Sequence, residues 1–163
     1  AAGKAQVALA AGVKSHSSTV YVCGSGSSLA THTRWFFSMS IDAEGNFDGS
    51  DDGWTLDGNV AADVLTATLS GPGGEAPAVN FAPVAEDGSA GLYTHSADGC
   101  TTGVVVWDAP DQPGGLGFQG AWCNDRDEFG QVIILQPDSF TADGGQARVD
   151  GRDDVMPFAV APF

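Results

Sequence analysis

The sequence predicts an all-β protein in which an antiparallel up-and-down meander closes into a barrel or a barrel-like sandwich. Three observations predict this fold class. Seven Asp-Gly dipeptides divide the chain, and Asp-Gly between apolar runs favours a hairpin turn because Gly adopts positive φ without steric cost. Apolar residues between these turns recur at a spacing of two, which is typical of half-buried strands. The connections are short, so consecutive strands are expected to pair antiparallel.

The individual strands follow from this alternation. Residues 33–41 place Trp35, Phe37, Met39 and Ile41 on one face and mainly polar residues on the other, which predicts a half-buried antiparallel strand. The Ala-rich N-terminal stretch also permits a helix, although its apolar residues alternate as in a strand. About ten short strands are expected, around residues 4–13, 18–23, 33–41, 47, 54–56, 62–69, 78–82, 90–93, 101–108, 116–123 and 130–136.

The C-terminal part of the chain differs in composition from the rest. We expect residues 1–137 to form the antiparallel β-domain, and residues 138–163 to form an acidic, Gly-rich spacer followed by an apolar segment. In that segment Phe158 and Val160 alternate as in a strand, and Phe163 follows them. Such a segment either docks on the edge of its own barrel or adds to a neighbour's sheet by β-augmentation. These three residues are therefore candidate partner-binding residues.

The cysteines suggest one disulfide. If the Pro- and Gly-rich loop places Trp107 opposite Leu116, the same register places Cys100 opposite Cys123. Directly opposed residues have Cβ atoms about 4.5–5.5 Å apart, close to disulfide range. We therefore expect a Cys100–Cys123 disulfide, with Cys23 buried in its strand. The alternative is three buried thiols that behave as small apolar side chains.

The charge of the chain argues against two classes of partner. The 163 residues include 21 acidic and 6 basic residues, which gives a formal net charge of −15. Such a surface repels nucleic acid and anionic lipid, and no apolar run approaches the roughly 18–20 residues of a membrane span. The acidity fits a salty or extracellular setting, a divalent cation or a basic partner.

One acidic stretch resembles the opening of a calcium-binding loop. Asp48, Ser50 and Asp52 alternate and are followed by Gly53, and calcium needs several oxygen ligands from a tightly turned backbone. The acidic ligand expected later in such a loop is missing, because Asn59 occupies its position. The alternative is two adjacent hairpin turns rich in Asp and Gly. No other cofactor is expected.

No catalytic motif stands out in the sequence. The chain has no Gly-x-Ser-x-Gly elbow in a strand-to-helix context, and its three histidines lack metal-ligand spacing. Trp54, Trp107 and Trp122 could stack on a sugar or another apolar ligand in a barrel mouth. The alternative is that they fill the core of a small β-domain.

A succession of short turn and core motifs runs through the chain. They are Val20-Tyr21-Val22-Cys23-Gly24, Trp35-Phe36, Phe47-Asp48-x-Ser50-Asp51-Asp52-Gly53, Leu56-Asp57-Gly58 and Ala90-Gly91-Leu92-Tyr93. This succession resembles a group of uncharacterised exported bacterial β-domain proteins over roughly residues 4–136. The resemblance implies the fold and export, and it implies no activity or catalytic residue. The cysteine pair and the long tail depart from the group.

These patterns predict an exported, non-enzymatic β-domain. The start at Ala1, without Met, is compatible with removal of a signal peptide, so we expect a bacterial extracellular or periplasmic protein. It would act as a structural, assembly or accessory subunit through protein–protein contacts or self-association. One alternative is a small-ligand or carbohydrate-binding β-barrel, and a second is an Asp-dependent secreted hydrolase. A filled core with a projecting tail favours the first function, a deep cavity lined by Trp54, Trp107 or Trp122 the second, and a cleft with two close carboxylates the third.

Overall fold

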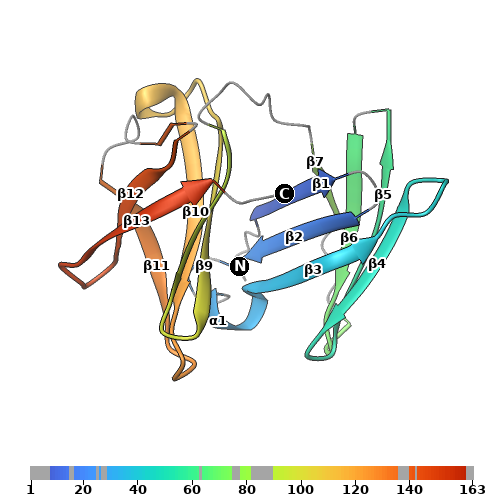
Figure 1. Cartoon of the computed structure of the whole chain (residues 1–163), viewed down its shortest axis with the longest axis horizontal. Coiled ribbons are helices and arrows are strands. Elements are labelled where there is room, and N and C mark those ends of the chain that lie inside the picture. The colour runs from blue at the N-terminus through green and yellow to red at the C-terminus, as the bar shows by residue number, and fades with distance from the viewer. Residues whose placement is uncertain are drawn as a thin grey trace, which may run out of the picture. The chain divides into compact units, whose positions relative to one another are not determined.

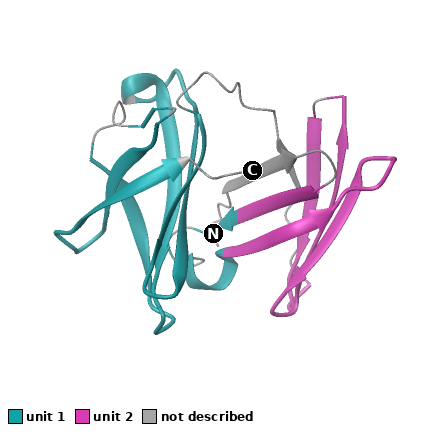
Figure 2. Ribbon diagram, in the orientation of Figure 1, with its two compact units in different colours: residues 1–8, 22–33, 84–162 teal, residues 9–21, 34–83, 163 magenta. Residues whose placement is uncertain are grey.

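The computed structural model describes most of the 163-residue chain and shows an all-β protein. The described residues are 8–14, 17–24, 26, 29–62, 64–74, 78–81, 90–135, 140–141 and 143–160. The chain divides into two compact units (Figure 2). The barrel unit comprises residues 1–8, 22–33 and 84–162, and the open-sheet unit comprises residues 9–21, 34–83 and 163.

Most strands lie close to the ranges that the alternation predicts, but one lies in the stretch expected to be a spacer. They are β1 (Ala8–Lys14), β2 (Ser17–Cys23), β3 (Arg34–Ser40), β4 (Asn46–Asp51), β5 (Trp54–Ala61), β6 (Val64–Ser70), β7 (Ala78–Phe81), β8 (Gly91–Ala97), β9 (Cys100–Asp108), β10 (Leu116–Cys123), β11 (Phe129–Ile134), β12 (Gly145–Val149) and β13 (Val155–Val160) (Figure 1). Two short helical turns, α1 (Leu29–His32) and η2 (Pro113–Gly115), were not predicted. The all-β prediction is therefore confirmed.

Strands β8 to β13 form a closed barrel in the order β10-β11-β12-β13-β8-β9. All neighbouring strands in it run antiparallel, as the sequence predicts. Side chains that alternate inward along the strands fill the interior. They are Tyr93, Val104, Val106, Trp122, Val132, Ile134, Phe140, Ala147, Val149, Met156 and Phe158. Closure pairs each barrel strand on both sides and so leaves no open strand edge.

The C-terminal segment takes part in the barrel. β12 pairs with β11 and β13, and β13 also pairs with β8. Phe140 and Ala147, in the stretch expected to be a spacer, are buried in the barrel core. Ala147 is buried because the apolar residues of β12 alternate toward the interior. The division expected between residues 1–137 and 138–163 thus does not coincide with the division between the two units.

The predicted Cys100–Cys123 disulfide is present and joins Cα atoms 5.8 Å apart. The register that led to it is wrong by one residue, because Trp107 lies opposite Gly117 rather than Leu116. A Cβ atom on Gly117 would overlap the indole of Trp107. The absence of a side chain there lets the large ring lie across the neighbouring strand.

The segment that ends β2 belongs to the barrel unit and contacts the barrel exterior. The Gln119 side chain on β10 donates a hydrogen bond to the carbonyl oxygen of Cys23 at 2.7 Å. The thiol of Cys23 is buried, as expected, and donates to the carbonyl oxygen of Gly24 at 3.2 Å. Cys23 is therefore part of the packing and hydrogen bonding of this segment.

The open-sheet unit contains a four-stranded sheet in the order β4-β5-β6-β7. A second sheet, β1-β2-β3, belongs largely to this unit. In the first sheet Leu56, Leu65 and Leu69 are buried on one face, while the alternate residues of β5 and β6 are mainly polar and exposed. Unlike the barrel, this sheet ends in two edge strands, β4 and β7.

Two of the Asp-Gly dipeptides lie inside strands of this sheet rather than in turns. Asp48-Gly49 is in β4 and Asp57-Gly58 is in β5. The ring of Phe47 lies where a Cβ atom of Gly58 would be, so this glycine serves side-chain packing. The expected turn does form at Asp52-Gly53, where both residues have positive φ.

Strand β3 contains a local reversal of its alternation. Phe36 and Met39 are both buried, three positions apart, while Phe37 is 61% exposed. Ser38 between them has a φ of 52°, and an extra residue of this kind is typical of a β-bulge. The prediction that Phe37 and Met39 share the inner face is therefore wrong.

Candidate functional site

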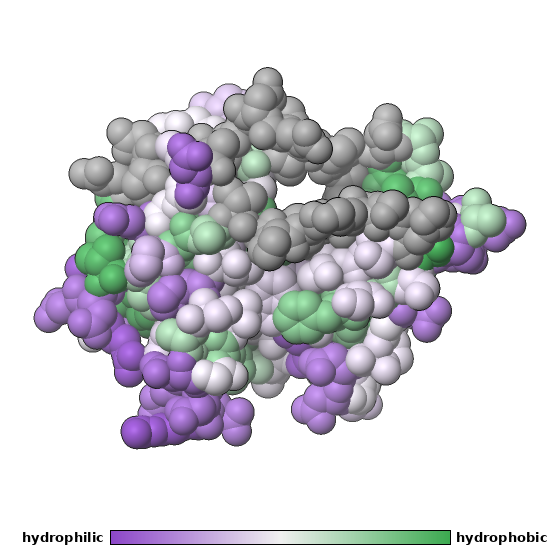
Figure 3. All heavy atoms as spheres, viewed as in Figure 1, coloured by the Kyte–Doolittle hydropathy of each residue, from purple (hydrophilic) through white to green (hydrophobic). Residues whose placement is uncertain are grey.

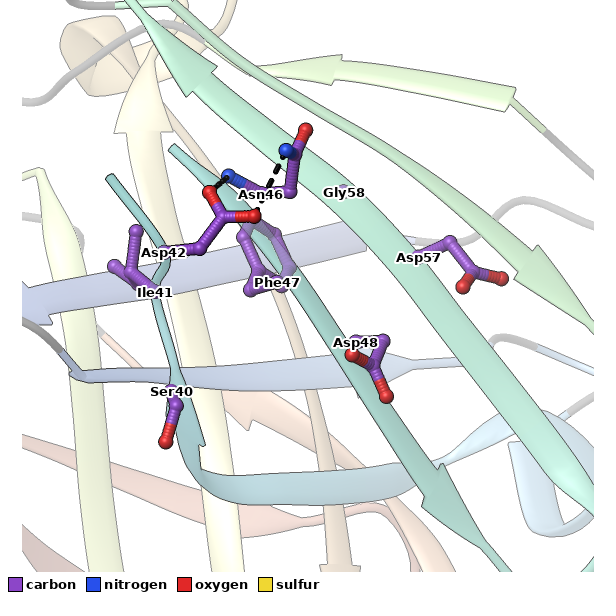
Figure 4. A pocket seen from close by; sticks show the side chains of 8 residues that line it. All are labelled: Ser40, Ile41, Asp42, Asn46, Phe47, Asp48, Asp57 and Gly58. Atoms are coloured by element: carbon purple, nitrogen blue, oxygen red, sulfur yellow. Dashed lines mark hydrogen bonds between the residues drawn. The ribbon is translucent and has the colours of Figure 1, made fainter. Parts of the chain in front are cut away.

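A shallow hollow of about 490 Å³ lies beside the open edge of β4, within the open-sheet unit (Figure 4). The end of β3 and the following turn form one side, and β4 and β5 form the other. Its lining residues are Ser40, Ile41, Asp42, Asn46, Phe47, Asp48, Asp57 and Gly58. The hollow therefore combines three carboxylates, one amide and two apolar side chains.

The upper end of the hollow is fixed by the turn between β3 and β4. Asp42 Oδ1 accepts hydrogen bonds from the main-chain N–H groups of Asn46 at 2.7 Å and Glu44 at 3.0 Å. Asp42 Oδ2 accepts one from the Asn46 side chain at 3.0 Å (Figure 4). Hydrogen bonds that Asn46 donates to Asp42 lower the pKa of Asp42. The side-chain amide has the larger effect, and the backbone N–H has the next largest. Both oxygens of the Asp42 carboxylate thus accept hydrogen bonds that stabilise the turn.

Two further carboxylates face each other across the strands. Asp48 of β4 lies directly opposite Asp57 of β5, and both are exposed. Side chains at such a position have Cβ atoms about 4.5–5.5 Å apart, and like charges there oppose pairing. In the described part of the chain, no Lys or Arg forms an ion pair with either of them. The pair therefore leaves uncompensated negative charge at the sheet surface.

The main chain of β4 also points toward the open edge. The N–H of Asn46 donates to Asp42 Oδ1, and the C=O of Asn46 accepts the N–H of Asp42 at 3.0 Å. Both groups of Asn46 thus point away from β5. Residues two apart in a strand direct these groups to the same side, so Asp48 and Ser50 direct theirs to the edge. Within the described residues no strand is hydrogen-bonded to this edge, although Phe36 and Met39 of β3 pack against β4 at Gly49.

The predicted calcium ligands are not arranged as a loop around an ion. Asp48 and Ser50 lie in the extended strand β4, and Asp52 lies in the turn that follows. All three side chains are exposed. Within the described ranges, no group of three or more His, Cys, Asp or Glu side chains is placed to hold a metal ion. The alternative, hairpin formation, describes this stretch better.

The three tryptophans proposed to bind a ligand are divided between the two units. Trp54 is buried in the open-sheet unit, with the guanidinium carbon of Arg34 4.4 Å from its ring centroid. Trp122 is buried in the barrel core, with that of Arg152 at 4.1 Å. Trp107 is 40% exposed on the barrel. Trp54 and Trp122 therefore serve the cores of two different units.

The three residues of the C-terminal segment that were expected to bind a partner differ in where the structure places them. Phe158 is 4% exposed and packs in the barrel core, so its side chain is not presented to a partner. Val160 pairs with Tyr93 of β8 through the main chain. Phe163 lies outside the described residues.

The sequence pattern placed Trp35 and Phe37 on one face of β3 but did not predict that Phe37 would be exposed. The rings of Trp35 and Phe37 stack with centroids 5.1 Å apart and planes 5° from parallel. Trp35 also contacts buried Tyr21 at 4.4 Å, while Phe37 is exposed. Figure 3 shows an apolar area over β3. Three consecutive aromatic residues, positions 35–37, cannot all face one side of a strand, so the sequence indicates that at least one of them faces outward but not which one.

Comparison with protein-family models, curated proteins and solved structures gives no match. In the described part of the chain, no helix has the length and apolar character needed to cross a bilayer.

Proposed function

We propose that this chain is a non-enzymatic accessory or structural module that works through protein–protein contacts. The exposure of Phe37 beside Trp35 carries the proposal. A large aromatic side chain in water loses the stabilisation that burial would give, about 1.5–3 kcal/mol. Aromatic residues are enriched where proteins contact their partners. The Trp35–Phe37 pair is therefore the proposed recognition surface.

The backbone beside Phe37 supports a recognition role. Ser38 has a φ of 52°, and a residue other than Gly in this region is disfavoured. Its N–H donates to Thr19 Oγ1 at 3.4 Å, which helps to hold the bulge. A regular strand would direct Phe37 inward with Met39. Bulges often redirect a side chain at a functional site.

The two alternative functions have weaker support. A ligand-binding barrel needs an interior cavity, whereas apolar side chains fill the described barrel interior. The Asp48–Asp57 pair provides the two carboxylates that a glycoside hydrolase requires. Both carboxylates, however, are exposed on strands beside a shallow hollow, and burial is a common means by which enzymes raise the pKa of a general acid.

The proposal includes an exported location, extracellular or periplasmic. The Cys100–Cys123 disulfide supports it, because disulfides persist mainly in oxidising compartments. Kinship with the exported bacterial β-domains that the sequence motifs resemble belongs to the same proposal.

Photo-cross-linking tests the recognition surface. A benzophenone side chain at position 37 of the full chain, expressed in the organism that makes it, should yield one defined cross-linked partner protein. The same group at Val64, which is also exposed, should not. Phe37→Ser should abolish co-purification of that partner and change the free energy of unfolding by less than about 0.5 kcal/mol. Identical cross-links from positions 37 and 64 would contradict the proposal.

A further inference from the structure

The open edge of β4 is a second surface with the features of a binding site, at some remove along the chain from Phe37. Edge strands expose unpaired main-chain N–H and C=O groups and are templates for another strand. Here Asp48 and Ser50 direct these groups outward, and the hollow between β4 and Ser40–Asp42 opens onto this edge. The Asn46 end is closed by its hydrogen bonds to Asp42. A partner strand would therefore pair beyond Asn46, along Asp48–Ser50.

The charges at this edge select the chemistry of the partner. Asp48 and Asp57 lie opposite each other with no described basic partner, and the chain carries a net charge of −15. A strand with Lys or Arg at alternate positions would bring its cations to the face that carries both carboxylates. It would relieve their repulsion while its main chain pairs with β4.

The same charges disfavour a second copy of this chain. Two β4 strands paired edge to edge would bring the Asp48 carboxylate of one copy close to that of the other. Like charges on edge strands are a known protection against self-pairing. An acidic or neutral strand gains no compensating attraction. The occupant that fits is a basic one.

We propose that the open edge of β4 binds a basic, extended segment of a partner protein by strand addition. This inference rests on the proposed function as a protein-contact module, and it assigns a second contact surface to that module. Main-chain pairing along Asp48–Ser50 supplies binding energy that does not depend on the sequence of the partner strand. The carboxylates of Asp48 and Asp57 supply the preference for basic side chains.

A peptide-binding measurement tests the proposal with the full chain. The probe is a fluorescent synthetic peptide of about seven alternating Lys and Thr residues, the length of an ordinary strand. We expect binding that weakens as salt rises, and no binding of the matching Glu–Thr peptide. Asp48→Asn combined with Asp57→Asn should weaken binding by about tenfold. Asp98→Asn, an exposed Asp in a barrel turn, is the matched control and should leave binding unchanged.

A second pair of variants separates strand addition from simple charge attraction. Ser50→Pro removes an edge-facing N–H that β5 does not use, and edge strands tolerate Pro at such positions. It should weaken binding by about fivefold or more, as expected for a lost hydrogen bond, whereas Ser50→Ala should not. A peptide methylated at alternate amide nitrogens provides the same test on the unaltered protein. The proposal would be overturned if the peptide does not bind. It would also be overturned if binding is unchanged both by Ser50→Pro in the protein and by methylation of the peptide.

The peptide-binding test of β4 and the cross-linking test of Phe37 can fail independently of each other. Phe37→Ser should bind the Lys–Thr peptide as the unaltered chain does. If the peptide fails to bind while cross-linking from position 37 still captures one partner, the β4 inference is wrong and the module function stands. If cross-linking fails and the peptide binds in the manner described, the recognition surface at Phe37 is wrong.

Discussion

The barrel and the β4–β7 sheet both bury alternate apolar residues, but the barrel is closed whereas the sheet has two edge strands. In the barrel every strand has two neighbours and a disulfide joins Cys100 to Cys123. In the other sheet β4 and β7 each have one neighbour. Closure satisfies main-chain groups internally, whereas an open edge leaves them for a partner. This difference in the edges is consistent with the proposal that the open-sheet unit, rather than the barrel, contacts a partner.

The largest expected effect contrasts two phenylalanines. Phe140 is 1% exposed and packs edge-on against Tyr93 with ring centroids 4.8 Å apart, so Phe140→Ala should cost about 3–5 kcal/mol of the free energy of unfolding. Phe37→Ala should change it by less than about 0.5 kcal/mol. Urea denaturation followed by circular dichroism measures both. Equal losses would remove the distinction between a packing residue and a recognition residue.

The disulfide should stabilise the barrel alone. Cys100 and Cys123 are separated by 23 positions, and a loop of this size gives about 3 kcal/mol by restricting the unfolded chain. The double replacement Cys100→Ser with Cys123→Ser should lower protection of β8–β11 amides in hydrogen exchange and leave β4–β6 unchanged. Reductant should have no further effect on this variant. Equal loss of protection in β4–β6 would show that the units unfold together.

Much of the fold could be predicted because its signals are local. Alternation predicts most of the strands, although not β12, and Asp-Gly predicts turns such as Asp52-Gly53 and Asp98-Gly99. The cysteine pairing was predicted correctly despite a one-residue error in register. The disulfide needs only that the two Cα atoms approach within several ångströms, and this condition tolerates such a shift.

The features that were missed depend on contacts between distant residues. Gly58 looked like a turn residue, but it lies in β5 and accommodates the ring of Phe47 from the neighbouring strand. The candidate site was found only in part, since Asp48 was singled out as a calcium ligand while its opposition to Asp57 requires the strand register. The bulge at Ser38 contains no Gly that would indicate a positive φ in the sequence. The outward orientation of the Phe37 side chain could therefore not be predicted from the spacing of apolar residues.

A smaller effect compares two arginines that stack on tryptophan, one in each unit. The Arg34 side chain is 8% exposed, donates to the carbonyl oxygen of Asp51 at 3.2 Å and lies over Trp54. Its replacement by Ala should cost about 1–2 kcal/mol, through lost stacking and a lost hydrogen bond. Arg152 is exposed over Trp122, so Arg152→Ala should cost about 0.5–1 kcal/mol. Urea denaturation ranks them, and the reverse order would contradict the assigned role of burial.

The smallest expected effect is a pH dependence confined to the open-sheet unit. Hydrogen bonds from Asn46 and Glu44 lower the pKa of Asp42 below its ordinary value of 3.8. A carboxyl group whose pKa is lower in the folded state stabilises that state above its unfolded pKa. This contribution is therefore complete at neutral pH, begins to fall near pH 3.8 and is lost as the pH drops through the lowered value. Asp42→Asn lacks the charge and should remove it at every pH.

Hydrogen exchange of the turn and of β4 amides, measured from neutral pH to below pH 3, follows this dependence and should be corrected for the intrinsic exchange rate. The unaltered chain should show higher protection than Asp42→Asn at neutral pH, and the difference should vanish at the acidic end. Asp98→Asn, in a barrel turn, should reproduce the unaltered profile of β4. A difference that persists unchanged below pH 3 would mean that Asp42 supports the turn through its shape and not its charge. The hollow would then keep its form in acid, and basic-strand binding would depend on Asp48 and Asp57 alone.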